Sequence, residues 1–318
     1  RELPRAHAFS GSVRERAALL RVLDGMDAVV SAAPYTANRA IAECAAESGV
    51  HYFDLTEDVR VAHFVKELAD GARVAFAPQC GVAPGYVSIA AVHVLGQFDE
   101  VDSLTLRTGA LPRQPNNRLK YNLTWSTEGL VNEYVLPCEA LRDGELAVIP
   151  PLEGEERLLI DGVAYEAFTT SGGAGTLCHT YRGKIRRLDY KTIRYPGHLE
   201  LIRFLLDDLR FKDAPRELAQ ILDRSVPHTR DDVVVVSIRA LGRVAGRYEE
   251  RTFSRTVPGR AIGAHAFTAI EVVTAAGVCG VLHLLLGGEL PARGLVRMEQ
   301  VPYVRFADTP FGRYYEQG

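Results

Sequence analysis

The chain has 318 residues, of which 47% are hydrophobic and 24% charged, and its formal net charge is −3. This composition predicts a globular protein of about two domains with a large core. It argues against a nucleic-acid-binding protein, because the basic residues are dispersed. The five cysteines lie far apart with no Cys-x-x-Cys pair, so neither a disulfide framework nor a metal site is predicted. Scattered thiols favour a reducing, cytoplasmic location.

Helices and buried strands alternate along the first third of the chain. The hydrophobic pattern predicts helices over 12–23, 38–48 and 59–70, with apolar strands over 28–33, 50–55 and 73–78. This alternation is typical of a doubly wound parallel sheet, which binds ligands at the carboxyl ends of its strands.

The sequence contains no Gly-x-Gly-x-x-Gly loop of the kind that receives a dinucleotide pyrophosphate. We therefore expect the α/β domain to lack its first βαβ unit in this chain. The chain begins at Arg1 rather than Met, which favours an N-terminal segment ahead of it. Adding one βαβ unit is then expected to strengthen the binding of NAD.

The stretch from Lys120 to Tyr134 changes from a strand-like pattern to a helical one. Ser126 is typical of a helix cap, and Pro137 ends the helix. Free N–H groups at the helix start, beside the flat ring of Trp125, suit a small polar ligand. Alternatively, Trp125 is a core residue, Ser126 only a cap and Glu128 only a partner of the helix dipole.

Strand patterns dominate from Val101 onward, over 158–170, 183–194, 232–241 and 247–257, and predict a second, mostly antiparallel domain. The apolar run 266–286 is interrupted by polar residues and glycines, so we expect a buried helix rather than a membrane span.

Four segments occur in an order that resembles the saccharopine dehydrogenase-like family. They are Ser31-Ala-Ala-Pro-Tyr-Thr36, Gly81-Val-Ala-Pro-Gly85, Lys120-Tyr-Asn-Leu-Thr-Trp-Ser126 and Thr192-Ile-Arg-Tyr-Pro-Gly197. Within that family, segments 124–134, 166–173 and 190–198 are most similar to the L-lysine 6-dehydrogenase branch.

The resemblance implies a Rossmann-like domain over 1–103 and an inserted α+β domain over 104–258 for substrate binding and dimerisation. Over 259–318 it implies a helix at 263–287 and a segment returning to the Rossmann domain. The implied enzyme is a homodimer that uses NAD, or NADP, to oxidise the ε-amine of L-lysine. Hydride passes to NAD, and water hydrolyses the imine to ammonia and 2-aminoadipate 6-semialdehyde, which cyclises. The alternatives are a saccharopine- or carboxynorspermidine-type dehydrogenase and a non-catalytic member without cofactor.

The resemblance also implies site residues. Those for the cofactor are Ser31, Ala32, Ala33, Pro34, Asp54, Leu55 and Thr56. Those for the substrate are Tyr35, Asn122, Trp125, Ser126, Glu128, Thr170, Ser171, Arg194 and Tyr195. Arg194 is a candidate partner for the substrate carboxylate, or else a member of an ordinary strand salt bridge.

His198 is the candidate general base, or else a structural helix cap, and Asp54 and Glu128 are the other candidates for the base. If His198 is the base, His198→Asn is expected to lower turnover about 100-fold and to remove the acid limb of the pH profile. Glu128 stands where saccharopine-binding relatives have an arginine. It is expected to attract an ammonium group, so that Glu128→Gln raises the KM for lysine.

Overall fold

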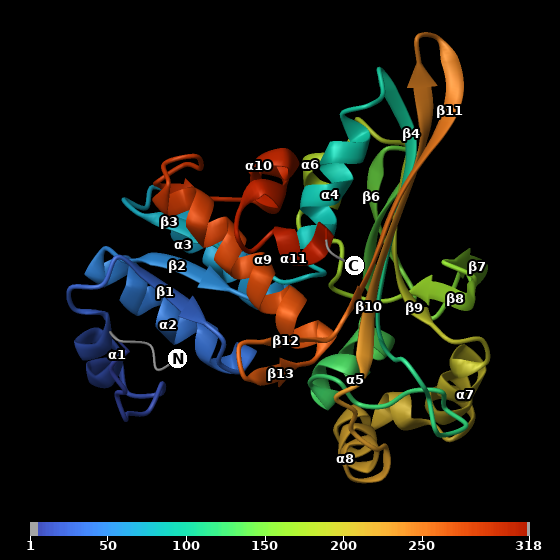
Figure 1. Cartoon of the computed structure of the whole chain (residues 1–318), viewed down its shortest axis with the longest axis horizontal. Coiled ribbons are helices and arrows are strands. Elements are labelled where there is room, and N and C mark those ends of the chain that lie inside the picture. The colour runs from blue at the N-terminus through green and yellow to red at the C-terminus, as the bar shows by residue number, and fades with distance from the viewer. Residues whose placement is uncertain (1–5, 317–318) are drawn as a thin grey trace.

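The computed structural model describes residues 6–316, and its two main β-sheets lie side by side (Figure 1). Arg1, on which the expectation about the chain start rests, lies outside the described residues.

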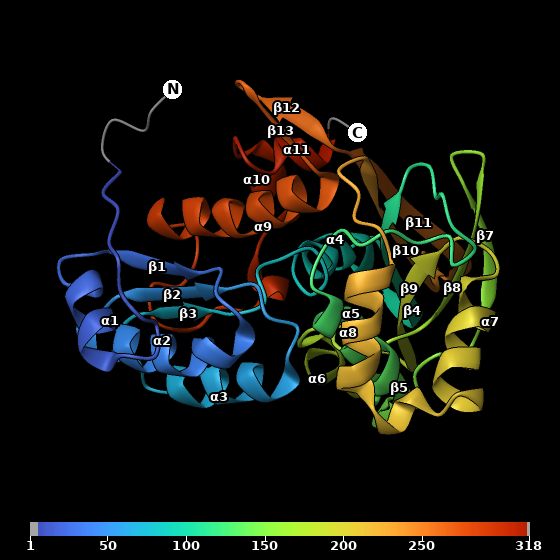
Figure 2. The same ribbon diagram turned by 90° about the horizontal axis from the view of Figure 1, so that it is seen from below.

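The first sheet is parallel, as predicted. Its strands β1 (Ala28–Ser31), β2 (His51–Asp54), β3 (Ala75–Ala77) and β14 (Gly294–Leu295) pair in that order. Helices α1 (Arg16–Leu23), α2 (Tyr35–Ser48) and α3 (Val59–Ala69) cover one face, and α9 (Ala269–Leu286) lies over the other (Figure 2). Strand β14 comes from near the end of the chain, so the C-terminal part does return to this sheet.

Helix α2 begins three residues earlier than predicted, because Pro34 stands at its N-cap and has the fixed φ that suits a helix start. It ends at Gly49, which adopts φ 69° and thereby accepts the left-handed conformation that closes a helix.

The second sheet has eight strands. They are β4 (Glu100–Pro112), β5 (Cys138–Arg142), β6 (Glu145–Ile149), β7 (Glu156–Ile160), β8 (Val163–Thr169), β9 (Arg187–Arg194), β10 (Asp232–Val244) and β11 (Arg247–Pro258). The main order is β11-β10-β4-β9-β5-β6, and β8 pairs with both β9 and β7. It is mostly antiparallel as predicted, but β4 and β9 run parallel. Strands β4, β5 and β6 were not predicted.

A shared core joins the two sheets. Helix α4 (Tyr86–Leu95) packs on β4 and β10, and α9 contacts both β2 and β10. Helix α9 is long and apolar enough to cross a membrane by length and composition, and more than half of it is buried inside the protein. It matches the buried helix predicted from the sequence. The boundaries proposed at 103 and 258 stay predictions.

The smaller elements pack around the two sheets. They are α5 (Thr127–Val135), α6 (Leu177–Thr180), α7 (His198–Arg203), α8 (Pro215–Ser225), β12 (Arg260–Ile262), β13 (His265–Phe267), α10 (Tyr303–Asp308) and α11 (Arg313–Glu316). Among them α8 packs on α5, and α10 and α11 pack on α9. The expected strand over 120–125 is wrong: this stretch is irregular and has one isolated bridge, between Leu123 and His228. Lys120 adopts φ 53°, which interrupts an extended run.

Candidate active site

A cavity of about 200 Å³ lies between the loops that follow strands of the first sheet and the inner end of the second sheet. Open α/β sheets bind ligands on this side, at the carboxyl ends of their strands. The lining comes from Leu55, Glu57, Gly81, Val82, Ala83, Pro84, Thr108, Ala110, Trp125, Glu133, Tyr190, Thr192, Arg194, Ile270 and Thr274. Of the residues predicted for the site, Leu55, Trp125 and Arg194 line this cavity.

Arg194 ends strand β9 and is almost fully buried. Its Nε donates to the Tyr134 hydroxyl at 2.9 Å, and one terminal nitrogen donates to the Ile193 carbonyl at 2.9 Å. Its guanidinium also lies over the Tyr121 ring, 4.9 Å from the centroid. The other terminal nitrogen is 3.7 Å from a carboxylate oxygen of Glu133, which is too long for a hydrogen bond. The two terminal nitrogens carry four N–H groups, of which one donates to Ile193, so donors on both nitrogens remain for a ligand in the cavity.

Glu133 is a site residue that the sequence analysis missed. Burial raises its pKa to about 8; nearby Arg194 opposes the shift and Glu57 adds to it. Five residues along an α-helix turn the side-chain direction by about 140°. Glu133 therefore lines the cavity while Glu128, on the same helix α5, is exposed. Segment 124–134, which carries the resemblance, contains both Glu128 and Glu133. Their positions in the sequence do not show which of the two faces the cavity.

Because the folded state holds the proton on Glu133 more tightly than an exposed glutamate does, its ionisation opposes folding. The protonated carboxyl of Glu133 therefore favours the folded state. This contribution to the free energy of unfolding is complete below the ordinary pKa of 4.5 and is lost as the pH rises through about 8. We expect the free energy of unfolding to fall with a slope of up to about 1.4 kcal/mol per pH unit over this window. Urea unfolding of wild type and Glu133→Gln at several pH values measures this. Parallel curves for the two proteins would contradict it.

Glu57 is the second carboxyl of the cavity, and it also was not predicted. It follows strand β2 closely, and burial raises its pKa. A Cβ at Gly129 would lie 2.8 Å from a Glu57 carboxylate oxygen and 2.5 Å from the Trp125 ring. Gly129 therefore leaves the room in which Glu57 reaches across to helix α5.

His198 lies behind the cavity rather than in it. Its Nδ1 donates to the Leu119 carbonyl at 2.8 Å, so its Nε2 accepts from the Tyr134 hydroxyl at 3.0 Å. Burial and then Arg194 lower its pKa to about 3. With both nitrogens bonded and burial opposing protonation, His198 is not placed to take a proton from a ligand in the cavity, and the geometry favours a structural role for it. His198 orients Tyr134, which in turn orients Arg194.

We expect His198→Asn to lower the free energy of unfolding by about 1 to 3 kcal/mol, since the shorter amide leaves a buried polar group without a partner. The pH dependence of kcat is expected to keep its shape. Chemical unfolding and a pH profile measured on the same preparation test both statements. Loss of the acid limb in this variant would restore His198 as the base.

Asp54, another candidate for the base, lies outside the lining of the cavity. Its carboxylate is fully buried and accepts hydrogen bonds from the Tyr52 hydroxyl at 2.8 Å, the Gln79 amide at 2.9 Å and the Thr56 amide at 3.1 Å. With all of these contacts inside the protein, it holds the loops after β2 and β3 together.

Glu128 is placed at an exposed rim, where a carboxylate oxygen accepts from the Tyr35 hydroxyl at 3.3 Å. It lies outside the lining of the cavity, so this geometry favours neither a base nor a substrate ligand at Glu128.

The other predicted residues lie outside the lining of the cavity. Ser31 lies opposite Asp54 in the parallel register, and its hydroxyl donates to Asn38 at 2.7 Å. Residues 32–35 continue from that strand end, and Thr56 adjoins the second one. Ser126 accepts from the Gly129 amide at 3.1 Å, which confirms it as a helix cap.

On the second sheet, the Tyr195 hydroxyl donates to the Pro112 carbonyl at 2.8 Å, and Asn122 donates to Asn116 at 3.1 Å. Thr170 and Ser171 line a separate cavity of about 60 Å³. The structure therefore does not bring Asn122, Ser126, Thr170, Ser171 or Tyr195 to the cavity that holds Arg194.

Two family models match the chain. The one described as the saccharopine dehydrogenase C-terminal domain matches residues 81–310, and the one described as the saccharopine dehydrogenase NADP binding domain matches residues 3–76.

Two solved structures have a similar fold. Apo saccharopine dehydrogenase (L-Glu forming) from Saccharomyces cerevisiae has a TM-score of 0.76 and 16% identity, over 97% of this chain and 86% of that chain. Homospermidine synthase from Legionella pneumophila in complex with NAD has a TM-score of 0.63 and 12% identity, over 93% of this chain and 76% of that chain. At these identities the likeness concerns the fold.

Proposed function

Because the chain belongs to the saccharopine dehydrogenase family, we propose that it is an NAD(P)-dependent dehydrogenase that oxidises the ε-amine of L-lysine or a close analogue. Its N-terminal domain is of the NADP-binding kind, which makes a nicotinamide cofactor part of the chemistry. The products are 2-aminoadipate 6-semialdehyde, which then cyclises, and ammonia.

The observation that carries the proposal is the charge arrangement of the cavity, where the Arg194 guanidinium and the Glu133 and Glu57 carboxyls all face one space. A guanidinium binds a carboxylate in a two-pronged manner, and a carboxylate binds an ammonium group. The set therefore suits a ligand that carries both groups, as an amino acid does. An ammonium group close to Glu133 also favours its ionised form.

The size of the cavity favours a small ligand. Pockets for drug-sized molecules commonly have about 300 to 1,000 Å³. The cavity here, with about 200 Å³, is smaller. This supports a single amino acid over saccharopine, in which two amino acids are joined.

The residues fit the nicotinamide end of the cofactor. Leu55, Val82 and Pro84 form an apolar wall of the cavity on the side of the first sheet, where a flat ring can lie. Residues 6–316 hold no glycine-rich turn after a first-sheet strand that could receive the pyrophosphate. When bound, the nicotinamide supplies the acceptor for the hydride of the amine-bearing carbon.

The protein residues then divide the remaining work. Arg194 binds the α-carboxylate, and Glu133, 3.7 Å from it, binds the α-ammonium group. The side chain of the substrate extends from there toward Glu57, which lines the same cavity as the apolar wall. There Glu57 accepts the proton that the ε-ammonium must lose before its carbon can be oxidised. One water then hydrolyses the protonated imine that the oxidation leaves. The nitrogen departs as ammonium, and the oxygen of the water becomes the aldehyde oxygen.

A substrate panel tests the proposal. Full-length protein is incubated with NAD or NADP and with L-lysine, cadaverine, Nε-acetyl-lysine or saccharopine, and nicotinamide absorbance is followed. We expect turnover with L-lysine, a much higher KM with cadaverine, which lacks the carboxylate, and no turnover with the acetylated amine. Preference for saccharopine would support a saccharopine-type dehydrogenase instead. Failure to bind either cofactor would indicate a non-catalytic family member.

We further propose that the protein is a cytoplasmic homodimer. The five cysteines are all free, which supports a reducing compartment. Light scattering of the purified protein measures the assembly, and a monomer at micromolar concentration would contradict the dimer.

A further inference from the structure

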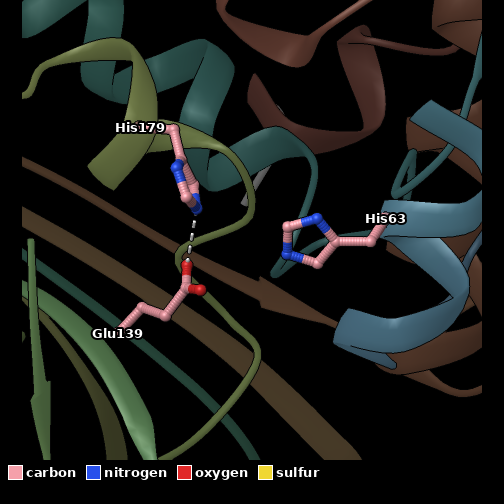
Figure 3. A group of neighbouring side chains, drawn as sticks. All are labelled: His63, Glu139 and His179. Carbon is pink, nitrogen blue, oxygen red and sulfur yellow. Dashed lines mark ion pairs between the residues drawn. The ribbon is translucent and has the colours of Figure 1, made fainter. Parts of the chain in front are cut away.

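A second group of polar side chains lies in a separate cavity between elements of the two sheets. His63 comes from α3, Glu139 from β5 and His179 from α6, and their side chains converge (Figure 3). We propose that these three residues bind a divalent transition-metal cation, of which Zn²⁺ is the best match. The bound ion would join the cofactor-binding domain to the second sheet.

The distances support a metal site. The Nε2 atom of His179 is 3.4 Å from a carboxylate oxygen of Glu139, and one ligand atom of each of the three residues lies within 4.8 Å of the others. Ligands about 2.0 to 2.1 Å from a tetrahedral zinc ion are about 3.3 Å apart. The first pair already has this separation, and a small rotation of the exposed His63 ring brings in the third ligand.

The chemistry of the ligands selects the class of metal. Two imidazoles and one carboxylate suit zinc and its neighbours in the first transition row, whereas Mg²⁺ and Ca²⁺ prefer oxygen ligands only. Within residues 6–316 the His63 ring makes an edge-to-face contact with the His179 ring, with centroids 6.0 Å apart, and no hydrogen bond, so its nitrogens can bind a metal. All three residues line a cavity of about 60 Å³, which leaves room for water as a fourth ligand.

The surroundings restrict the site to these three residues. Cys138 and Cys178 precede Glu139 and His179 in the sequence, but their thiols are buried in the core. Lys66 lines the same cavity one turn after His63, and its positive charge opposes a cation. The two histidines and Glu139 therefore favour binding of the metal ion, and the positive charge of one lysine weakens it. The sequence contains no short motif that predicts this site, because its ligands are 76 and 40 residues apart (139 − 63 and 179 − 139).

Zinc titration of metal-free, full-length protein against a chromophoric chelator tests the proposal, with no need for enzyme turnover. We expect one equivalent to bind wild type, at least about 10-fold weaker binding in His63→Ala, His179→Ala and Glu139→Gln, and no change in the control His265→Ala. His265 is exposed on β13, away from the cluster. Because the three ligands are exposed or half-buried, the variants should keep the metal-free Tm of wild type.

The thermal unfolding of the same proteins tests the connection between the domains. Zinc is expected to raise the Tm of wild type and of His265→Ala but not that of His63→Ala, whose remaining ligands both belong to the second domain. Equal zinc affinity in wild type and the three cluster variants would overturn the site. A zinc-induced Tm rise that persists in His63→Ala would overturn the link between the domains.

Discussion

Glu57→Gln is expected to lower the kcat for L-lysine by about 100-fold or more, with a change in KM of less than about threefold. The amide keeps the shape of the side chain but cannot accept the proton of the ε-ammonium, and loss of a general base typically costs at least this much. Burial raises the pKa of Glu57, and the carboxyl must be ionised to act as base. In wild type kcat therefore falls as the pH is lowered through this raised pKa, and the variant should lack that limb.

Glu128→Gln is the matched control for this substitution. It makes the same chemical change at an exposed carboxylate on the neighbouring helix α5, which accepts a hydrogen bond from Tyr35. We expect both kcat and KM to stay within about twofold of wild type, because an exposed pair contributes under about 1 kcal/mol. This replaces the rise in KM expected from the sequence, since Glu128 lies outside the lining of the cavity. Equal losses in Glu57→Gln and Glu128→Gln would show that Glu57 does not supply the base.

Arg194→Lys is expected to raise the KM for L-lysine by about 10-fold to 100-fold. Lysine keeps the positive charge next to Glu133 but loses the planar fork that binds a carboxylate with two hydrogen bonds. Each charge-assisted hydrogen bond contributes about 1.5 to 3 kcal/mol, which corresponds to this range. The KM for cadaverine should stay the same, because this diamine has no carboxylate to lose contact with.

Arg187→Lys serves as the control, since Arg187 lies at the other end of β9 and its side chain is largely exposed. Its kinetics should match those of wild type. If Arg194→Lys raises the KM for L-lysine and for cadaverine by the same factor, Arg194 does not bind the α-carboxylate and its role is to hold the site together.

The elements that the sequence predicted well are those whose signal is local. The alternation of helices and apolar strands over 12–78 predicted the parallel sheet, and the resemblance of four ordered segments pointed to the family that the domain models confirm. Ser126 and Pro137 correctly predicted where helix α5 begins and ends, because helix capping and helix termination depend only on neighbouring residues. The strand expected over 120–125 is wrong because Tyr121 and Leu123 pack into a core formed with helices α5, α7 and α8 instead of pairing in a sheet.

The identity of the functional side chains depended on tertiary structure. Glu128 and Glu133 are alike in the sequence, but only the packing of α5 against the second sheet buries Glu133 and raises its pKa. His198 looked like a base from its place at a helix start. The fold instead encloses it beside Tyr134 and Arg194, where desolvation keeps it neutral. Burial and charge neighbours set a pKa, and both come from residues far apart in the chain, so the sequence determined the family and the fold while the three-dimensional packing decided which carboxyl groups can act.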